Sequence, residues 1–391
     1  MGAEQTSITI HFEGTISPGS VTADYTIVGT GAIASATENG GSHRTTSGTT
    51  ATVINTVIGW MSANQVTEFF GNLTIGSSVT ISKSSITLDF GTSPRAKVTA
   101  SVGNTFDVRG THNTIIGGDF SGADNLIIAG YGGSYLTIDS AILHNAPTET
   151  CNLNNNGHNT IINCEFYNAP QTLIIASTAG NSLISGNNFH NFGQGLSLHG
   201  IYVDHSTNNE FVNNKFHDPT SGGAGILLKG GNNLIHDNEF YNMAASTNPP
   251  ISMYEQYLNV SNNQIYNNNF HDNYYGMIIG NNIDANPSIH TFIHDNHFTS
   301  CTYAIWLPFD SASARSYTDI EIYYNIFTNN AHALSGSSDT ASHIVDTIIA
   351  YNTFTPSISS PSIENFQNTM VYGNTGLTDF NVPSPLPISP R

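Results

Sequence analysis

The sequence predicts an all-β protein, a single right-handed parallel β-helix with an N-terminal helical cap. Three observations lead to this fold class. A short phrase returns eight times between residues 159 and 355, its period of 23 to 30 residues is that of a solenoid coil, and the Asn, Gly and β-branched content disfavours helix. The right-handed sense follows from the general preference of parallel strand crossovers.

The chain before the repeats divides into two parts. Residues 1–48 alternate apolar and polar residues in ITIHFEG and DYTIVGTG, which predicts a small β segment or an ordered arm. Residues 49–65 hold one amphipathic helix, with Val53, Val57, Ile58 and Met61 at helical spacing. We expect this helix to cap the solenoid end, which would otherwise expose a sheet edge and its core.

The repeated phrase Ile-x-x-Asn-x-Phe organises residues 66–378 into about ten coils, roughly 4.8 Å apart. It predicts a strand, a tight bend and a second strand, with Ile and Phe pointing inward. Asn suits the bend because it tolerates left-handed backbone, and its amide can bond to the Asn of the next coil. The phenylalanines expected in one buried column are Phe189, Phe216, Phe240, Phe270 and Phe298.

Another short strand follows in each coil, as in GIYVDHS from residue 200 and GILLKGG from residue 225. Period 2 sends alternate residues outward, so that equivalent residues of successive coils form rows. The two outward rows that we expect consist of Tyr202, Leu227, Ser252, Ile278 and Trp306, and of Asp204, Lys229, Tyr254, Gly280 and Pro308. Residues 379–391 are Pro-rich and read as an extended linker or surface wrap.

Composition excludes several classes of protein. Charged residues make up only 9%, yet no apolar run is long enough to span a bilayer, so membrane insertion is not expected. The net charge of −19 opposes nucleic acid binding. Cys151, Cys164 and Cys301 fit neither a disulfide framework nor a zinc motif, and we expect buried thiols.

The helical cap and the N-x-I-x-x-N-x-F phrase over roughly residues 49–378 resemble the parallel β-helix repeat superfamily, the pectin-lyase-like fold, in its carbohydrate-binding and sugar-hydrolysis type. The resemblance implies a polysaccharide partner and a lyase, epimerase or glycoside hydrolase activity. The stretch HGIYVDHS at 199–206 is also similar to the Tyr, Asp and His cluster of alginate epimerases and lyases on this fold, in a different order. Fold does not choose among these activities.

The candidate catalytic residues lie where the outward rows bring titratable groups together. They are Asp204, His205, Lys229, Tyr254 and Glu255. An ion pair with Asp204 would keep Lys229 charged, and that ammonium would favour phenolate character on Tyr254, which could abstract a sugar proton. Alternatively, Asp204 and Glu255 are the carboxylate pair of an inverting hydrolase, about 10 Å apart. The alternative without catalysis is that these residues form an exposed salt bridge on the sheet surface.

Other outward residues are candidates for substrate binding. Tyr202, Trp306 and Phe309 offer sugar platforms, and Arg315 is one of three basic residues in the repeat region. Two further outward columns, one containing His236 and Tyr266 and the other His217 and Tyr241, would either stack on sugars or stack on themselves; we favour self-stacking. No cofactor is predicted; calcium is the alternative, although no calcium motif in the sequence supports it.

The sequence therefore predicts an extracellular or surface protein that acts on a polysaccharide, with a non-catalytic adhesin or structural rod as the alternative. The polar, Lys-poor surface motivates the location. The opening Met-Gly-Ala-Glu-Gln lacks the basic-then-apolar pattern of a secretion signal, so we expect that any signal was removed or never present. Oligomeric state is not predicted.

Overall fold

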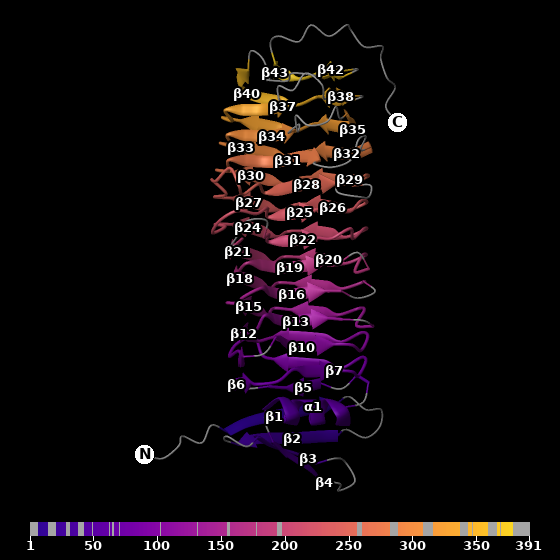
Figure 1. The fold of residues 1–391 in the computed structure, drawn as a ribbon, viewed down its shortest axis with the longest axis vertical. Helices are drawn as coiled ribbons and strands as arrows, with labels where there is room; N and C mark the ends of the chain where they lie inside the picture. Colours follow the sequence, from indigo (N-terminus) through magenta and orange to yellow (C-terminus); the bar gives the residue numbers. More distant parts are fainter. Residues whose placement is uncertain are drawn as a thin grey trace, which may run out of the picture. The chain divides into compact units, whose positions relative to one another are not determined.

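The structure is a computed structural model. It describes residues 7–14, 21–28, 32–37, 43–48, 50–61, 63–64, 66–69, 71–101, 103–130, 132–154, 157–176, 178–193, 198–255, 260–281, 288–307, 316–336, 343–345, 347–358, 366–367 and 369–377. The chain forms two compact units, Met1–Asn188 and Phe189–Arg391. After an N-terminal segment in the first unit, each unit is built from short parallel strands that stack coil on coil, as the labels in Figure 1 show.

The N-terminal segment forms two antiparallel hairpins. β1 (Ser7–Gly14) pairs with β2 (Val21–Val28), and β3 (Ala32–Thr37) pairs with β4 (His43–Gly48). The predicted helix is α1 (Thr50–Trp60), which packs against β6 (Asn72–Ile75) and β7 (Val79–Ile81) of the first coil. Val57, Ile58 and Met61 are buried as expected, whereas the side chain of Val53 lies outside the described residues. The helical cap is therefore confirmed.

Three sheets of parallel strands make up the rest of the first unit. The first sheet contains β7 (Val79–Ile81), β10 (Asn104–Val108), β13 (Asn125–Ala129), β16 (Glu149–Leu153) and β19 (Gln171–Ile175). The second contains β5 (Val66–Glu68), β8 (Thr87–Phe90), β11 (Thr114–Gly117), β14 (Thr137–Asp139), β17 (Thr160–Ile162) and β20 (Leu183–Ser185). The third contains β6 (Asn72–Ile75), β9 (Lys97–Ala100), β12 (Asp119–Ser121), β15 (Ile142–His144) and β18 (Glu165–Ala169).

The second unit repeats this three-sheet arrangement. Its first sheet contains β22 (Ile201–Val203), β25 (Ile226–Leu228), β28 (Ile251–Glu255), β31 (Tyr275–Asn281), β34 (Tyr303–Leu307) and β37 (His332–Gly336). The second contains β23 (Glu210–Val212), β26 (Leu234–His236), β29 (Asn263–Tyr266), β32 (Ser288–His294), β35 (Ser316–Tyr323), β38 (His343–Val345), β39 (Ile348–Ala350), β41 (Phe366–Gln367) and β42 (Met370–Tyr372). The third contains β21 (Asn188–Phe192), β24 (Lys215–His217), β27 (Glu239–Tyr241), β30 (Asn269–His271), β33 (His297–Thr299), β36 (Ile326–Thr328), β40 (Thr353–Ile358) and β43 (Thr375–Leu377).

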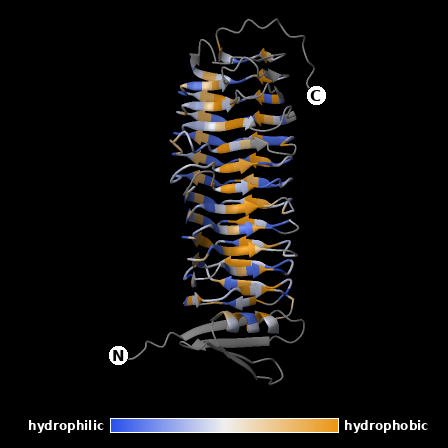
Figure 2. Cartoon of the chain, viewed as in Figure 1, coloured by the Kyte–Doolittle hydropathy of each residue, from blue (hydrophilic) through white to orange (hydrophobic). Residues whose placement is uncertain are grey.

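Apolar side chains from all three sheets fill the interior of each unit, and Figure 2 shows the hydrophobic residues recurring along the strands. In the second unit the phenylalanines of the repeated phrase form one buried column. Ring centroids from Phe189 to Phe354 are 4.7 to 5.1 Å apart, and the rings are within 9° of parallel. The predicted column is confirmed, and it sets the register of the third sheet.

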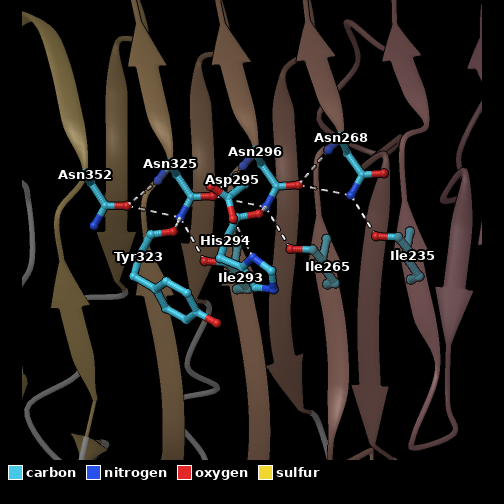
Figure 3. Close-up of polar contacts among 10 residues, drawn as sticks. All are labelled: Ile235, Ile265, Asn268, Ile293, His294, Asp295, Asn296, Tyr323, Asn325 and Asn352. Carbon is cyan, nitrogen blue, oxygen red and sulfur yellow. Dashed lines mark hydrogen bonds and ion pairs between the residues drawn. The ribbon is translucent and has the colours of Figure 1, made fainter. Parts of the chain in front are cut away.

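Asparagines of the repeated phrase form a hydrogen-bonded ladder beside this column (Figure 3). The Nδ2 of Asn296 donates to the Oδ1 of Asn325 at 3.0 Å and to the carbonyl oxygen of Ile265 at 2.8 Å. These amides are buried, and each one that found no partner would cost about 1–3 kcal/mol. The ladder therefore supplies the bonds that allow polar bends inside an apolar stack.

The bend departs from the sequence expectation in one detail. The left-handed residue is the one that precedes the ladder asparagine, as in Asn213 (φ 56°), Asp237 (φ 54°) and Asn267 (φ 53°). The ladder asparagine itself is needed for its side-chain bonds. A second buried ladder, Asn209–Asn233–Asn263, was not predicted and has Nδ2 to Oδ1 distances of 3.0 and 3.2 Å.

Candidate functional site

The candidate site lies on the outer side of the first sheet of the second unit, and its register follows the predicted rows. Tyr202 pairs with Leu227, Leu227 with Ser252, Ser252 with Ile278, and Ile278 with Trp306. Val203 pairs with Leu228, which brings the next residues, Asp204 and Lys229, into register. Inward Val203 and Leu228 are fully buried and anchor both strands.

A hydrogen bond and a cation–π contact join Lys229 to Tyr202 in this site. The Lys229 Nζ donates to the Tyr202 hydroxyl at 2.9 Å and lies 4.9 Å from the centre of the Tyr202 ring. The Tyr202 hydroxyl donates in turn to the Asp204 Oδ1 at 3.2 Å. Tyr202, which we expected to bind substrate, therefore links Lys229 to Asp204.

His205 completes the cluster. Its Nδ1 is 2.9 Å from the Asp204 Oδ1, and its backbone is left-handed (φ 58°), which is uncommon for a residue other than glycine. A carboxylate only accepts hydrogen bonds, so the neutral His205 ring carries its proton on Nδ1 and offers the Nε2 lone pair to a ligand. An imidazole held in this way is suited to accept a proton.

Burial shifts the ionisation of the central pair. It raises the pKa of Tyr202 to about 12, and the Asp204 carboxylate adds to this effect. Burial also lowers the pKa of Lys229, while Asp204 opposes that change. Tyr202 therefore keeps its proton at pH 7 and well above it. The expected phenolate character concerns Tyr254, whose side chain lies outside the described residues.

The remaining predicted site residues are placed less completely. Tyr254 and Glu255 pair through their backbones with Gly280 and Asn281, but their side chains lie outside the described residues, as do Phe309, Pro308 and Arg315. Leu227 belongs to the outward row but is only 9% exposed, so this face is partly covered.

Trp306 belongs to an aromatic cluster on the same face. Its ring stacks on Tyr275 with centroids 4.9 Å apart, and Tyr303 stacks on His332 at 4.7 Å. Trp306 is four strands from Tyr202 in the row, which corresponds to roughly 19 Å. The aromatic cluster around Trp306 and the polar cluster around Lys229 are therefore separate parts of one face.

His199, Tyr275 and Tyr303 also lie on this face and were not predicted from the sequence. Strict alternation from Ile305 sends Tyr303 inward, but β34 has two successive buried residues, Ala304 and Ile305, which returns Tyr303 to the outside. Gly276 occupies the equivalent of Ala304, where a Cβ would lie 2.6 Å from the Phe298 ring. Glycine or alanine one residue before the first inward residue was the signal for this break.

The other outward columns stack on themselves, as favoured above. His236, Tyr266 and His294 have centroids 4.6 and 5.1 Å apart, and His217 lies 4.7 Å from Tyr241, with all these rings within 9° of parallel. Ring faces are covered by their neighbours, and His236 is also held by Glu210 and Asp237. Among the described residues, no group of three or more His, Cys, Asp or Glu side chains could hold a metal ion.

The three cysteines are buried and free, as predicted. Burial raises the pKa of the Cys164 and Cys301 thiols to about 12 and also raises that of Cys151. Within the described part of the chain, no helix has the length and apolar character needed to cross a membrane.

The family model described as "right handed beta helix region" matches residues 104–223, 149–307 and 199–376. The chain belongs to this family. The predicted right-handed parallel β-helix is thereby confirmed, together with the fold-level resemblance stated above. No curated protein matches the sequence.

Solved structures of the same fold share little sequence with this member of the right-handed β-helix family. The catalytic domain of a GH87 α-1,3-glucanase in complex with nigerose has a TM-score of 0.64 and 10% identity, covering 95% of this chain and 87% of that one. The A-module of the mannuronan C-5 epimerase AlgE6 from Azotobacter vinelandii has a TM-score of 0.56 and 11% identity, covering 79% and 88%. The tailspike of E. coli bacteriophage HK620 in complex with a pentasaccharide has a TM-score of 0.58 and 10% identity, covering 82% and 67%. At these identities the likeness shows the fold alone.

Proposed function

We propose that this β-helix protein is a polysaccharide lyase that acts on a uronic-acid polymer through the Lys229–Tyr202–Asp204–His205 cluster. The observation that carries the proposal is the unbroken hydrogen-bonded chain from Lys229 Nζ through the Tyr202 hydroxyl and Asp204 to His205. Structures of similar fold act on or bind saccharides, which supports a carbohydrate substrate.

Each residue has a role in β-elimination. His205, oriented by Asp204, accepts the C5 proton of the uronate through its Nε2. The electron pair of the C–H bond forms the C4–C5 double bond, and the C4–O bond to the leaving sugar breaks. Tyr202 gives its proton to the leaving oxygen, and the Lys229 ammonium stabilises the phenolate that remains.

The geometry favours a lyase over an epimerase. Tyr202 and His205 both contact the same Asp204 oxygen, at 3.2 and 2.9 Å, so both approach a sugar from one side. Elimination on one face needs a base and an acid on that face. Epimerisation needs a proton from the opposite face, where the cluster supplies no group.

The decisive experiment incubates the protein with a panel of acidic and neutral polysaccharides. We expect ultraviolet absorbance from an unsaturated product with an acidic polymer, together with new reducing ends. Reducing ends without absorbance would replace the lyase by a hydrolase using Asp204 and Glu255. If no polysaccharide gives either absorbance or new reducing ends, the protein is better explained as a non-catalytic adhesin or structural rod.

We also propose that the protein works outside the cell or on its surface, where a polymeric substrate is found. The low content of Lys and the Asn-, Ser- and Thr-rich composition support this location. Fractionation of the native source is the test, and recovery in the cytosol would refute the proposal.

A further inference from the structure

His199 is a buried titratable group that the proposed reaction does not use. Only 8% of this residue is exposed, although it lies just before β22 on the outer side of the first sheet. Its ring centroid is 5.9 Å from that of Tyr202, with the rings tilted by 32°. His199 therefore forms part of the wall against which the Tyr202 ring lies.

The backbone of the next coil holds the His199 ring in one orientation. The Ala224 N–H donates to the His199 Nδ1 at 2.9 Å. A ring nitrogen that accepts a hydrogen bond carries no proton, so the proton of the neutral ring is on Nε2. The pKa of His199 is lowered to about 4, by burial and by the nearby Lys229, so that the ring is neutral at pH 7.

A glycine lets the next coil approach closely enough for this bond. A Cβ on Gly223 would lie 1.5 Å from the carbonyl oxygen of Leu198, and Gly223 has a φ of 139° that side chains rarely tolerate. The Gly223–Ala224 backbone can therefore pass directly over Leu198 and His199. The positions of the two coils and of the imidazole are set together.

We propose that His199 is a positioning residue of the candidate site: its imidazole, bonded to the Ala224 amide, fixes the Tyr202 ring so that the Tyr202 hydroxyl stays between Lys229 and Asp204. The inference rests on the proposed function for its catalytic consequence. Its structural part concerns only residues His199, Ala224 and Tyr202, and can be tested without a substrate.

Three variants distinguish the hydrogen bond between the Ala224 N–H and His199 from the volume that the His199 side chain fills. His199→Leu removes the acceptor and keeps an apolar filler. His199→Asn places an amide oxygen where Nδ1 lies and should keep the bond to the Ala224 N–H. Ala224→Pro removes the donor and leaves His199 in place; proline is compatible with the backbone there because Pro249 occupies the same position in the next coil.

The first readout is the ionisation of Tyr202, followed by NMR of tyrosines labelled at the ζ carbon, with Tyr202→Phe giving the assignment. In the parent protein we expect titration near pH 12. His199→Leu and Ala224→Pro should move the midpoint of Tyr202 toward the ordinary tyrosine value of 10, while His199→Asn should keep it near that of the parent. Tyr275, three coils from His199, is the internal control and should not move.

The second readout is turnover of the acidic polysaccharide. A misplaced acid should lower kcat about 100-fold in His199→Leu and Ala224→Pro, with KM changed less than about threefold, and His199→Asn should recover kcat to within about tenfold. An unchanged Tyr202 midpoint in His199→Leu and Ala224→Pro overturns the inference, as does an equal shift in His199→Asn. If the midpoint responds as expected and no polysaccharide is turned over, the positioning role stands and the proposed function fails.

Discussion

At the scale of single residues, the site depends on Lys229 and Tyr202. Lys229→Ala and Tyr202→Phe should each lower turnover of the acidic polysaccharide about 10²- to 10⁴-fold, because one removes the charge that stabilises a phenolate and the other removes the proton donor. Neither side chain packs in the interior, so we expect the melting temperature to change by only a few degrees.

Lys215→Ala is the matched control for these variants. Lys215 pairs with Glu239 at 3.2 Å on an exposed surface and belongs to the third sheet. Its loss should leave turnover unchanged. Equal losses of activity in Lys215→Ala and Lys229→Ala would mean that total charge, and not the Tyr202 contact, controls the reaction.

Trp306 should act on binding. In Trp306→Ala we expect KM to rise about three- to tenfold, because one aromatic contact with the substrate is lost. The kcat should stay nearly constant, because Trp306 is remote from Tyr202. Steady-state kinetics on long and short oligosaccharides measures both constants. Short substrates that cannot reach from Tyr202 to Trp306 should show no difference between parent and variant; a difference there would place Trp306 in the reaction itself.

At the scale of elements, the phenylalanine column carries the packing of the third sheet. Phe240→Ala should lower the free energy of unfolding by about 3–5 kcal/mol, because the ring is fully buried between Phe216 and Phe270. Tyr241→Ala, one residue on and facing outward, should cost far less. Urea denaturation compares the two, and a cost below about 1 kcal/mol for Phe240→Ala would contradict its place in the column.

The strands and their register could be predicted from the sequence, but some side-chain directions could not. The phrase around Phe240 recurs often enough to predict its strands, their register and the inward side chains. Strict period 2 does not predict the break of alternation at Ala304–Ile305, because it excludes two adjacent inward residues; the small residue at this position was the signal that was not used. For the same reason Tyr275, Tyr303 and His199 were missed, although the row from Tyr202 to Trp306 was correct.

Individual contacts within the site were harder still. Register alone brings Asp204, Lys229 and Tyr254 close together, and it does not show that Lys229 donates to the Tyr202 hydroxyl. The long Lys229 side chain reaches back to Tyr202, on the preceding coil. Whether a side chain points toward the preceding or the following coil depends on how buried its surroundings are. The residue types in a row do not give that information.

At the scale of the whole molecule, alkaline pH should weaken the fold. Tyr202 and Tyr275 have pKa values raised from 10 to about 12, and the Cys164 and Cys301 thiols are raised from 9 to about 12. Groups with raised pKa values bind their protons more tightly when folded, so their contribution is complete below about pH 9 and is lost as the pH rises toward about 12. Melting temperatures measured from pH 8 to pH 11 should fall steadily above pH 9; a constant value over that range would contradict the burial of these groups.

The asparagine ladder has a consequence for how such a chain can change its length. From Asn238 to Asn352, each ladder asparagine donates to the side-chain amide oxygen of the next asparagine in the ladder and to a backbone carbonyl oxygen of the preceding coil. Every coil offers the same two kinds of acceptor. Removing residues 238–267 would present Asn214 with the Oδ1 of Asn268, which is equivalent to the Asn238 Oδ1 that it now meets. Gene duplication or deletion can therefore add or subtract one complete coil without a mismatch, whereas the loss of a single residue at a bend disrupts every bond of that rung.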